Sequence, residues 1–528
     1  MTNNTVELPE VHFNLLEEAW IPILDETGKS RELNIIEVFR HAHHIKQIQD
    51  ASPEHEFGIY RFLIALIMDC YKISNLEDLK DLLERGEFDE TIPNELISIK
   101  NRFDLFDPEH PFYQGTPHNI EKKDLRSVCK LFHHLPSGIN PIFFHHFFED
   151  EIAVSAKICA RALCALPAFS TAGGVGFSPS INGTPPIYEL IEGKNLFQTL
   201  LLNTYTGYTD FPAEPFEVPW RSNEFVESKA IKMVTSYLHG LTWMPRYCVL
   251  TPMKEKGVCR YSNEPNQILV KQIVFKPGWK FVDDANIWRD PNVAYRTTKK
   301  GRFPIRYTPG KDFWRDYGPL MLLTEKDYEN EKTHIRFNRP TIIKQLGEIN
   351  QDSQDLELER VSLNLYVLES DKAKLKNWRR SILSLPKEIV FSEHSGQIIQ
   401  ELIDAAELVE YYINTSLKHL YPRDTKGNSS GFKLIREQAT TSYWNRLHLP
   451  FEKKVVHFLK ENLDDPNVSE KIKTFWGDLL VKTANSVVEE ILDSFDGSAE
   501  YLKKAEEVRN DYRPKVYGLA KRLMPAQP

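Results

Sequence analysis

From residue 386 to the end of the chain, apolar residues recur at a helical spacing through four long segments. In the first segment Ile398, Leu402, Ala405 and Val409 follow one another at three or four positions, which places them on one face of an α-helix. Short polar links such as residues 464–466 separate the segments, and helices joined in this way pack as antiparallel neighbours. We therefore predict a C-terminal four-helix bundle over residues 386–528, with helices at 397–420, 441–463, 468–492 and 498–523.

Residues 1–385 carry mixed signals of helix and strand. Segment 56–71 is apolar on all sides and predicts a buried helix, and segment 76–85 predicts an amphipathic one. A small-residue helix is expected over 152–166 and should end at Pro167, because proline cannot continue the hydrogen-bond ladder. Alternation over 268–275 predicts a strand. The fold class that follows is α+β: a large mixed α/β N-terminal domain, residues 1–385, followed by the four-helix bundle.

Composition narrows the class of protein. The formal net charge is -9 and the isoelectric point is near 6.1, which excludes a globally basic nucleic-acid binder but leaves room for a few basic loops on an acidic body. No run of about 18 apolar residues predicts a membrane span, and the polar first ten residues predict no signal peptide. Six cysteines without close pairing suit a reducing compartment, so a cytoplasmic location is expected.

The densest glycine segment runs from Ala172 to Phe177 and contains Gly173, Gly174 and Gly176. A phosphate cradle would need a lysine after the glycines and a strand before them, and this segment has neither. Two interpretations remain: a loop that needs left-handed backbone for its own packing, and a backbone element that meets a grooved partner such as the minor groove of DNA.

A basic stretch interleaved with aromatic residues follows in the second half of the N-terminal domain. Its basic members are Arg296, Lys299, Lys300, Arg302, Arg306, Lys311 and Arg315. Lys299, Lys300 and Gly301 form the expected tip of a β-hairpin between segments 294–298 and 302–307. Cations and aromatic rings on a hairpin suit contact with nucleic-acid phosphates, although a solvated strand pair has the same pattern.

A second basic run, residues 371–380, precedes Pro386. Asp371 has the character of a helix N-cap, and the residues after it favour an exposed helix start over a binding element.

A histidine cluster offers a different chemistry. It comprises His133, His134, His145 and His146, followed by Glu149, Asp150 and Glu151. Histidine and carboxylate together bind metal ions, so the alternative function is a metal-dependent nuclease that uses residues 133–151. The spacing matches no known metal motif, and an ordinary polar and aromatic loop is favoured.

Taken in order, these segments resemble the large subunit of the type I-E CRISPR surveillance complex, Cascade (the CasA family). The resemblance rests on the N-terminal Phe13-Asn14-Leu15-Leu16 with Trp20-Ile21-Pro22, on His110-Pro111-Phe112-Tyr113-Gln114, on Pro136-Ser137-Gly138-Ile139-Asn140, on the glycine segment with Asn182-Gly183-Thr184-Pro185, on the Lys299-Lys300-Gly301 tip, on the 371–380 segment and on the helical C-terminus. It spans nearly the whole chain, and its specificity lies in the ordered set of motifs.

Membership implies a non-catalytic subunit of an RNA-guided antiviral complex, without a cofactor. Such a subunit recognises the protospacer-adjacent motif (PAM) of target duplex DNA from the minor groove and opens the duplex for guide pairing. The implied partners are the other Cascade subunits, the guide CRISPR RNA, double-stranded target DNA and the helicase-nuclease that the complex recruits.

The resemblance also implies roles for individual residues. Gly173, Gly174 and Gly176 would face the minor groove, together with Lys299 or Lys300 at the hairpin tip. Asp371, Lys372 and Ala373 would form a wedge, although family members commonly have glutamine where this chain has Lys372. The residues of a loop that docks on the neighbouring subunit near the guide's 5′ handle would be Ser137, Gly138, Ile139, Asn140, Phe143 and Phe144. Some members have a cysteine cluster near the position of Cys259, and because Cys259 stands alone here, no zinc is expected.

Overall fold

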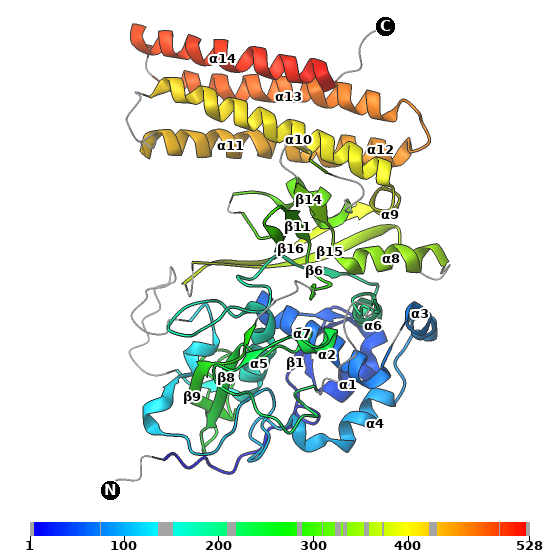
Figure 1. Ribbon diagram of the computed structural model, residues 1–528, viewed down its shortest axis with the longest axis vertical. Helices are drawn as coiled ribbons and strands as arrows, with labels where there is room; N and C mark the ends of the chain where they lie inside the picture. The colour runs from blue at the N-terminus through cyan, green and yellow to red at the C-terminus, as the bar shows by residue number, and fades with distance from the viewer. Residues whose placement is uncertain are drawn as a thin grey trace. The chain divides into compact units, whose positions relative to one another are not determined.

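The computed structural model describes residues 5–73, 75–135, 152–207, 218–281, 288–308, 310–322, 329–330, 335–352, 358–371, 374–421, 430–495 and 497–523. The chain forms two compact units (Figure 1). Unit 1 consists of Met1–Tyr307, Pro340–Glu357 and Ser362–Leu383, and unit 2 of Thr308–Arg339, Leu358–Val361 and Ser384–Pro528. The predicted mixture of helices and strands followed by C-terminal helices is confirmed. Of the described helices, none has the length and apolar character that crossing a membrane requires.

Helix α2 (Pro53–Tyr71) is the core of unit 1. The buried helix predicted over 56–71 is confirmed, and it begins three residues earlier at Pro53, a first-turn position where the missing N–H costs nothing. Its own side chains are buried on all sides of the helix, including those of the charged residues Glu56 and Arg61. Its closest neighbour is α5 (Ala156–Phe169). A Cβ built on Gly58 would lie 2.7 Å from the backbone of Ala165, so the two helices approach this closely only because position 58 is glycine.

Helix α5 does not end at Pro167 as predicted; it continues to Phe169. A proline in the last turn removes one backbone hydrogen bond rather than breaking the helix. Ser170 closes the end instead, since its N–H and its hydroxyl donate to the carbonyl of Leu166 at 3.3 and 2.8 Å.

The other described helices of unit 1 surround this core, and the predicted helix over 76–85 is confirmed as α3. They are α1 (Ile35–His41), α3 (Leu76–Arg85), α4 (Thr91–Ser98), α6 (Leu196–Leu202), α7 (Tyr237–Leu241) and α8 (Thr341–Asp352).

Three sheets and two shorter strand pairs complete unit 1. One sheet has the order β2 (Ser30–Leu33), β1 (Ile21–Asp25), β3 (Ile45–Ile48). In the second, β9 (Leu269–Pro277), the strand predicted over 268–275, pairs with β4 (Leu125–Ser127), β5 (Val154–Ser155) and β8 (Arg246–Pro252). In the third, β15 (Arg360–Asp371) lies between β16 (Lys374–Pro386) and β6 (Tyr188–Ile191). The short pairs are β7 (Ile231–Lys232) with β10 (Lys280–Phe281), and the hairpin of β11 (Tyr295–Thr298) and β12 (Gly301–Pro304).

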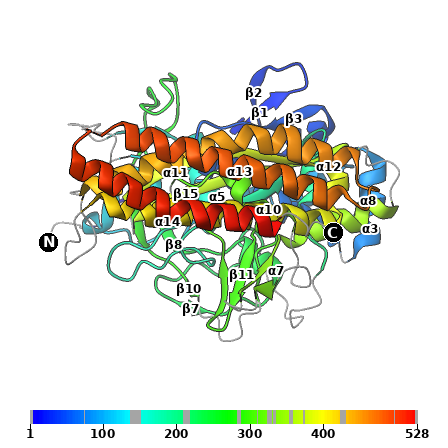
Figure 2. The ribbon, with the colours of Figure 1, turned by 90° about the horizontal axis from the view of Figure 1, so that it is seen from above.

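Unit 2 contains four long helices that lie side by side, as Figures 1 and 2 show: α10 (Glu393–Ser416), α11 (Ser430–Pro450), α13 (Val468–Asp493) and α14 (Ala499–Leu523). The shorter elements are α9 (Lys387–Val390), α12 (His457–Glu461), β13 (Glu329–Asn330) and β14 (Ile335–Asn338). The helix predicted over 441–463 is wrong in two ways, because α11 begins at Ser430 and a π-helical turn, Phe451–Val456, follows Pro450 and separates α11 from α12. A proline without an N–H and a local change of helix type commonly occur together.

Candidate nucleic-acid interface

The glycine loop, residues 172–177, leaves α5 just after Ser170. Gly174 and Gly176 have φ of +99° and +85°, which glycine adopts freely and side chains disfavour. Val175 between them is 95% exposed, the most exposed of the large apolar residues in the described chain. The left-handed backbone predicted here is therefore present, and the loop presents its tip to solvent rather than using it for packing.

Arg246 fixes both stems of the glycine loop. Its guanidinium donates to the carbonyls of Thr171 (2.6 Å) and Ser178 (2.7 Å), which lie on either side of the loop. It also lies 5.2 Å from the ring centroid of Phe177, which in turn stacks on Phe275 at 5.8 Å. Burial lowers the pKa of Arg246 to about 10, and among the described residues no carboxylate pairs with it. A cation without a counter-charge therefore lies beneath the loop.

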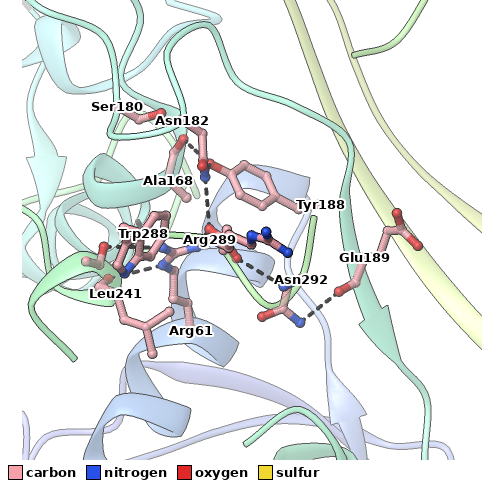
Figure 3. Close-up of polar contacts among 12 residues, drawn as sticks. Arg61, Ala168, Ser180, Asn182, Tyr188, Glu189, Leu241, Trp288, Arg289 and Asn292 are labelled. Carbon is pink, nitrogen blue, oxygen red and sulfur yellow. Dashed lines mark hydrogen bonds and ion pairs between the residues drawn. The ribbon is translucent and has the colours of Figure 1, made fainter. Parts of the chain in front are cut away.

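A second turn, residues 180–187, follows the glycine loop and rests on a buried polar network (Figure 3). Asn182 donates through Nδ2 to Asp290 Oδ2 at 2.9 Å and to the hydroxyl of Tyr188 at 3.3 Å. Asp290 Oδ2 also pairs with Arg61 Nη1 of α2 at 2.6 Å, and both side chains are almost fully buried. Burial lowers the pKa of Arg61, while Asp290, Tyr188 and Tyr237 raise it; the net shift is upward, so the guanidinium stays charged in the core.

The same network holds the base of the β11–β12 hairpin. The hydroxyl of Tyr295, the first residue of β11, donates to Asn182 Oδ1 at 3.3 Å and accepts from the N–H of Asp290 at 3.0 Å. After β12, Arg306 Nε donates to the carbonyl of Thr184 at 3.0 Å, and Ile305 accepts from the N–H of Ile187 at 3.0 Å. The hairpin and the turn that follows the glycine loop, more than 100 residues apart in sequence, therefore share one polar support.

The hairpin tip matches the prediction. Thr298 pairs with Gly301, so Lys299 and Lys300 form the two-residue turn, and both lysines are exposed. Arg296 on the adjoining strand is exposed as well, and no carboxylate within the described ranges forms an ion pair with any of the three. Burial, and to a smaller extent the nearby charge of Arg296, lowers the pKa of Arg306.

Two residues of the predicted basic stretch belong to unit 2 instead. Lys311 pairs with Asp316 (2.6 Å) and Glu407 (3.2 Å). Arg315 pairs with Glu410 at 2.8 Å and lies 3.6 Å from the ring centroid of Trp444. Their charges are compensated inside unit 2, so they are not part of the hairpin surface.

Segment 371–380 is a strand, and the helix start favoured from the sequence is wrong. β15 ends at Asp371 and β16 begins at Lys374, so the position of the predicted wedge is the connection of a long β-hairpin; Lys372 and Ala373 lie outside the described residues. Two cations of this run serve the fold, because Arg380 pairs with Glu56 of α2 at 2.9 Å and Arg379 lies 4.7 Å from the ring centroid of Tyr307.

The two described histidines of the 133–151 cluster have other partners. His133 Nδ1 lies 2.7 Å from Glu54 Oε2, and His134 stacks on Trp378 with 4.8 Å between ring centroids. Burial lowers the pKa of His134 to about 4. Where the chain is described, no group of three or more potential ligands could hold a metal ion. The described range excludes His145, His146, Glu149, Asp150 and Glu151, and also the predicted docking residues Ser137, Gly138, Ile139, Asn140, Phe143 and Phe144.

The segment His110–Gln114 has a structural role. Gln114 donates through Nε2 to the carbonyl of Leu105 at 2.8 Å and accepts at Oε1 from the N–H of Leu250 at 2.7 Å. His110 stacks on Phe225 at 4.9 Å and lines a cavity of about 660 Å³ in unit 1. Cys259, where no zinc is expected, is buried, and its Sγ accepts from the N–H of Ser155 of β5 at 3.2 Å.

Sequence reasoning missed Arg61, Arg246 and Asp290, which support the loops. A buried arginine and aspartate carry no local sequence signal, and the partners lie far apart along the chain. The only sequence sign was a lone arginine, at position 61, within the apolar run 57–68 of the predicted buried helix.

The model of the family described as "CRISPR-associated protein Cse1" matches residues 14–486. The chain belongs to the Cse1 family. A relative, the CRISPR-associated protein CasA/Cse1 of Thermus thermophilus, is 29% identical over 421 residues, which cover 77% of each chain.

Solved Cse1 structures have the same fold. Cse1 of Acidimicrobium ferrooxidans superposes with a TM-score of 0.72 and 18% identity, covering 98% of this chain and all of that one. Cse1 of Thermobifida fusca gives 0.73 at 18% identity, covering 97% and 99%. A chain of a structure described as a CRISPR RNA-guided surveillance complex gives 0.74 at 17% identity, covering 96% and 100%. The resemblance inferred from the ordered motifs is thus confirmed at the level of the family.

Proposed function

We propose that this chain is a non-catalytic subunit of an RNA-guided DNA surveillance complex that recognises the PAM of target duplex from the minor groove. Its family supports the setting, since a structural neighbour is part of such a complex. The observation that carries the proposal is a single polar network, made by Asn182, Asp290 and Tyr295, that holds both the base of the basic hairpin and the turn that directly follows the glycine loop.

The chemistry of the two elements fits a duplex. The tip has glycine on both sides of Val175, and the absence of side chains at these two positions favours close approach of the backbone to a groove. Exposed lysines on the neighbouring hairpin attract phosphates, which position a protein on DNA, while the minor groove offers only a degenerate pattern to read. A tolerant motif preference is therefore expected.

The remaining roles complete the proposal. The β15–β16 connection at Asp371, Lys372 and Ala373 acts as the wedge that unstacks the duplex so that guide RNA pairs with the target strand. Ser137, Gly138, Ile139, Asn140, Phe143 and Phe144 dock on a neighbouring subunit near the guide's 5′ handle, and the subunit helps recruit the helicase-nuclease. The proposed location is the cytoplasm.

The hairpin lysines provide the test. In the reconstituted complex, replacing Lys299 and Lys300 with alanine is expected to weaken binding of PAM-bearing duplex by about tenfold, and to reduce the slope of log K against log salt by about two. Equilibrium binding at several salt concentrations measures both quantities.

The matched control removes two exposed lysines of unit 1, Lys46 and Lys194, and should leave binding unchanged. Assembly of the complex should be normal for both double variants. A Lys299→Ala/Lys300→Ala complex that binds the duplex as tightly as the parent would rule out the role of the hairpin.

A further inference from the structure

A third segment lies against the glycine loop. Lys229 is in a turn that precedes β7, and a Cβ built on Gly176 would lie 3.5 Å from Lys229 Cε and 3.5 Å from Pro277 Cγ. The methylene chain of Lys229 therefore runs beside the glycine at position 176. No motif in the sequence pointed to this residue.

The backbone at Lys229 is in a left-handed conformation, with φ of +66°. Its N–H donates to the carbonyls of Pro277 (3.3 Å) and Gly278 (3.1 Å), and the hydroxyl of Ser228 donates to the carbonyl of Pro277 at 2.9 Å. A non-glycine residue in this region is disfavoured, and such outliers concentrate where a protein binds something. The turn is thus fixed to the end of β9 in a conformation that glycine would adopt more easily, yet the residue is lysine.

Exposed acids also lie on this segment, Glu224 and Glu227, but Glu224 pairs with Lys232 rather than with Lys229. Lys229 is exposed, and within the described chain no carboxylate forms an ion pair with it. Arg246, buried under the loop stems, adds a second positive charge without a counter-charge. Arg246 fixes the two ends of the glycine loop, and hydrogen bonds of its own turn fix Lys229. The positive charges of both residues are therefore in position before a ligand binds.

We propose that Lys229 contacts the phosphodiester backbone of duplex DNA next to the segment that the glycine loop meets. This inference rests on the proposed function, since the glycine loop must face the duplex for Lys229 to reach a phosphate. A lysine reads no base here; it fixes the position of the loop on DNA of any sequence.

Salt-dependent binding by the reconstituted complex tests the inference with three variants. Lys229→Ala should lower the slope of log K against log salt by about one, on PAM-bearing and PAM-free duplex alike, with the ratio of the two affinities unchanged. Lys229→Arg should keep the slope of the parent. Lys229→Gly should lower the slope by the same amount as Lys229→Ala, although glycine adopts the left-handed backbone of this turn without strain. Comparison of the two variants separates the effect of charge from that of turn geometry.

The control is Lys46→Ala, which removes an exposed lysine on β3 and should leave the slope unchanged. A Lys229→Ala complex with the slope of the parent overturns the inference, even if the parent prefers PAM-bearing duplex. A parent complex that shows no such preference contradicts the proposed function instead, and the slope still reports whether Lys229 contacts phosphate.

Discussion

Replacing Asp290 with asparagine is expected to lower the free energy of unfolding of unit 1 by about 3–5 kcal/mol. Asparagine keeps the shape of the side chain but leaves the buried guanidinium of Arg61 without its carboxylate, which lies at 2.6 Å and is itself almost fully buried. An uncompensated buried charge is among the most destabilising changes a core can undergo. Urea unfolding followed by circular dichroism measures the loss.

The control is an exposed ion pair of the same unit. Arg40 and Glu90 lie 2.7 Å apart, with about half of each side chain exposed to solvent. Glu90→Gln should cost far less stability than Asp290→Asn, because water screens the exposed pair. Equal unfolding midpoints for Asp290→Asn and Glu90→Gln would show that Asp290 does not stabilise the turn at residues 180–187 and the base of the β11–β12 hairpin.

Gly58→Ala is expected to destabilise the chain by about 2–3 kcal/mol, because the added methyl would lie 2.7 Å from the backbone of Ala165 and helices α2 and α5 would have to separate. Alanine normally stabilises a helix relative to glycine, so the sign of the effect is diagnostic. Since α5 leads directly into the glycine loop, binding of PAM-bearing duplex should weaken as well. Thermal unfolding and duplex binding by the complex provide the two measurements.

Gly518→Ala is the matched control for this variant. Gly518 is also inside a helix, α14, but nothing lies within 4 Å of the Cβ that alanine would add. This substitution should raise stability by up to about 1 kcal/mol. A Gly58→Ala chain that is as stable as the parent would show that α2 and α5 are not in tight contact.

The spacing of apolar residues along the sequence correctly predicted those helices whose burial follows directly from that spacing. α2 is apolar on all sides and α3 is amphipathic, and both were predicted to within three residues. The two-residue tip at Lys299 and Lys300 was predicted because β-type residues flank a lysine pair and a glycine. The conformational need for Gly174 and Gly176 was also visible, since a run of glycines fits neither helix nor strand.

Long-range structure overrode local signals elsewhere. Segment 371–380 has a helix-like start, but β16 pairs with β15 in the sheet, and Arg380 reaches Glu56 more than 300 residues away. Lys311 and Arg315 looked like part of the basic hairpin, yet they pair with Glu407 and Glu410 of α10, and Lys311 also pairs with Asp316. The contact of Arg61 with Asp290, 229 residues apart, depends wholly on tertiary folding.

Disulfide trapping tests most directly whether the glycine loop faces the minor groove. All six native cysteines are buried, so a cysteine at position 175, which is 95% exposed as valine, provides an accessible thiol. Complexes with Val175→Cys are mixed with duplexes that carry a thiol tether on either the minor-groove or the major-groove edge of a PAM base pair, and Ile97→Cys, exposed on α4, serves as the control. Our account predicts rapid trapping by the minor-groove tether alone and none with Ile97→Cys; trapping by the major-groove tether, or by both tethers equally, would contradict it.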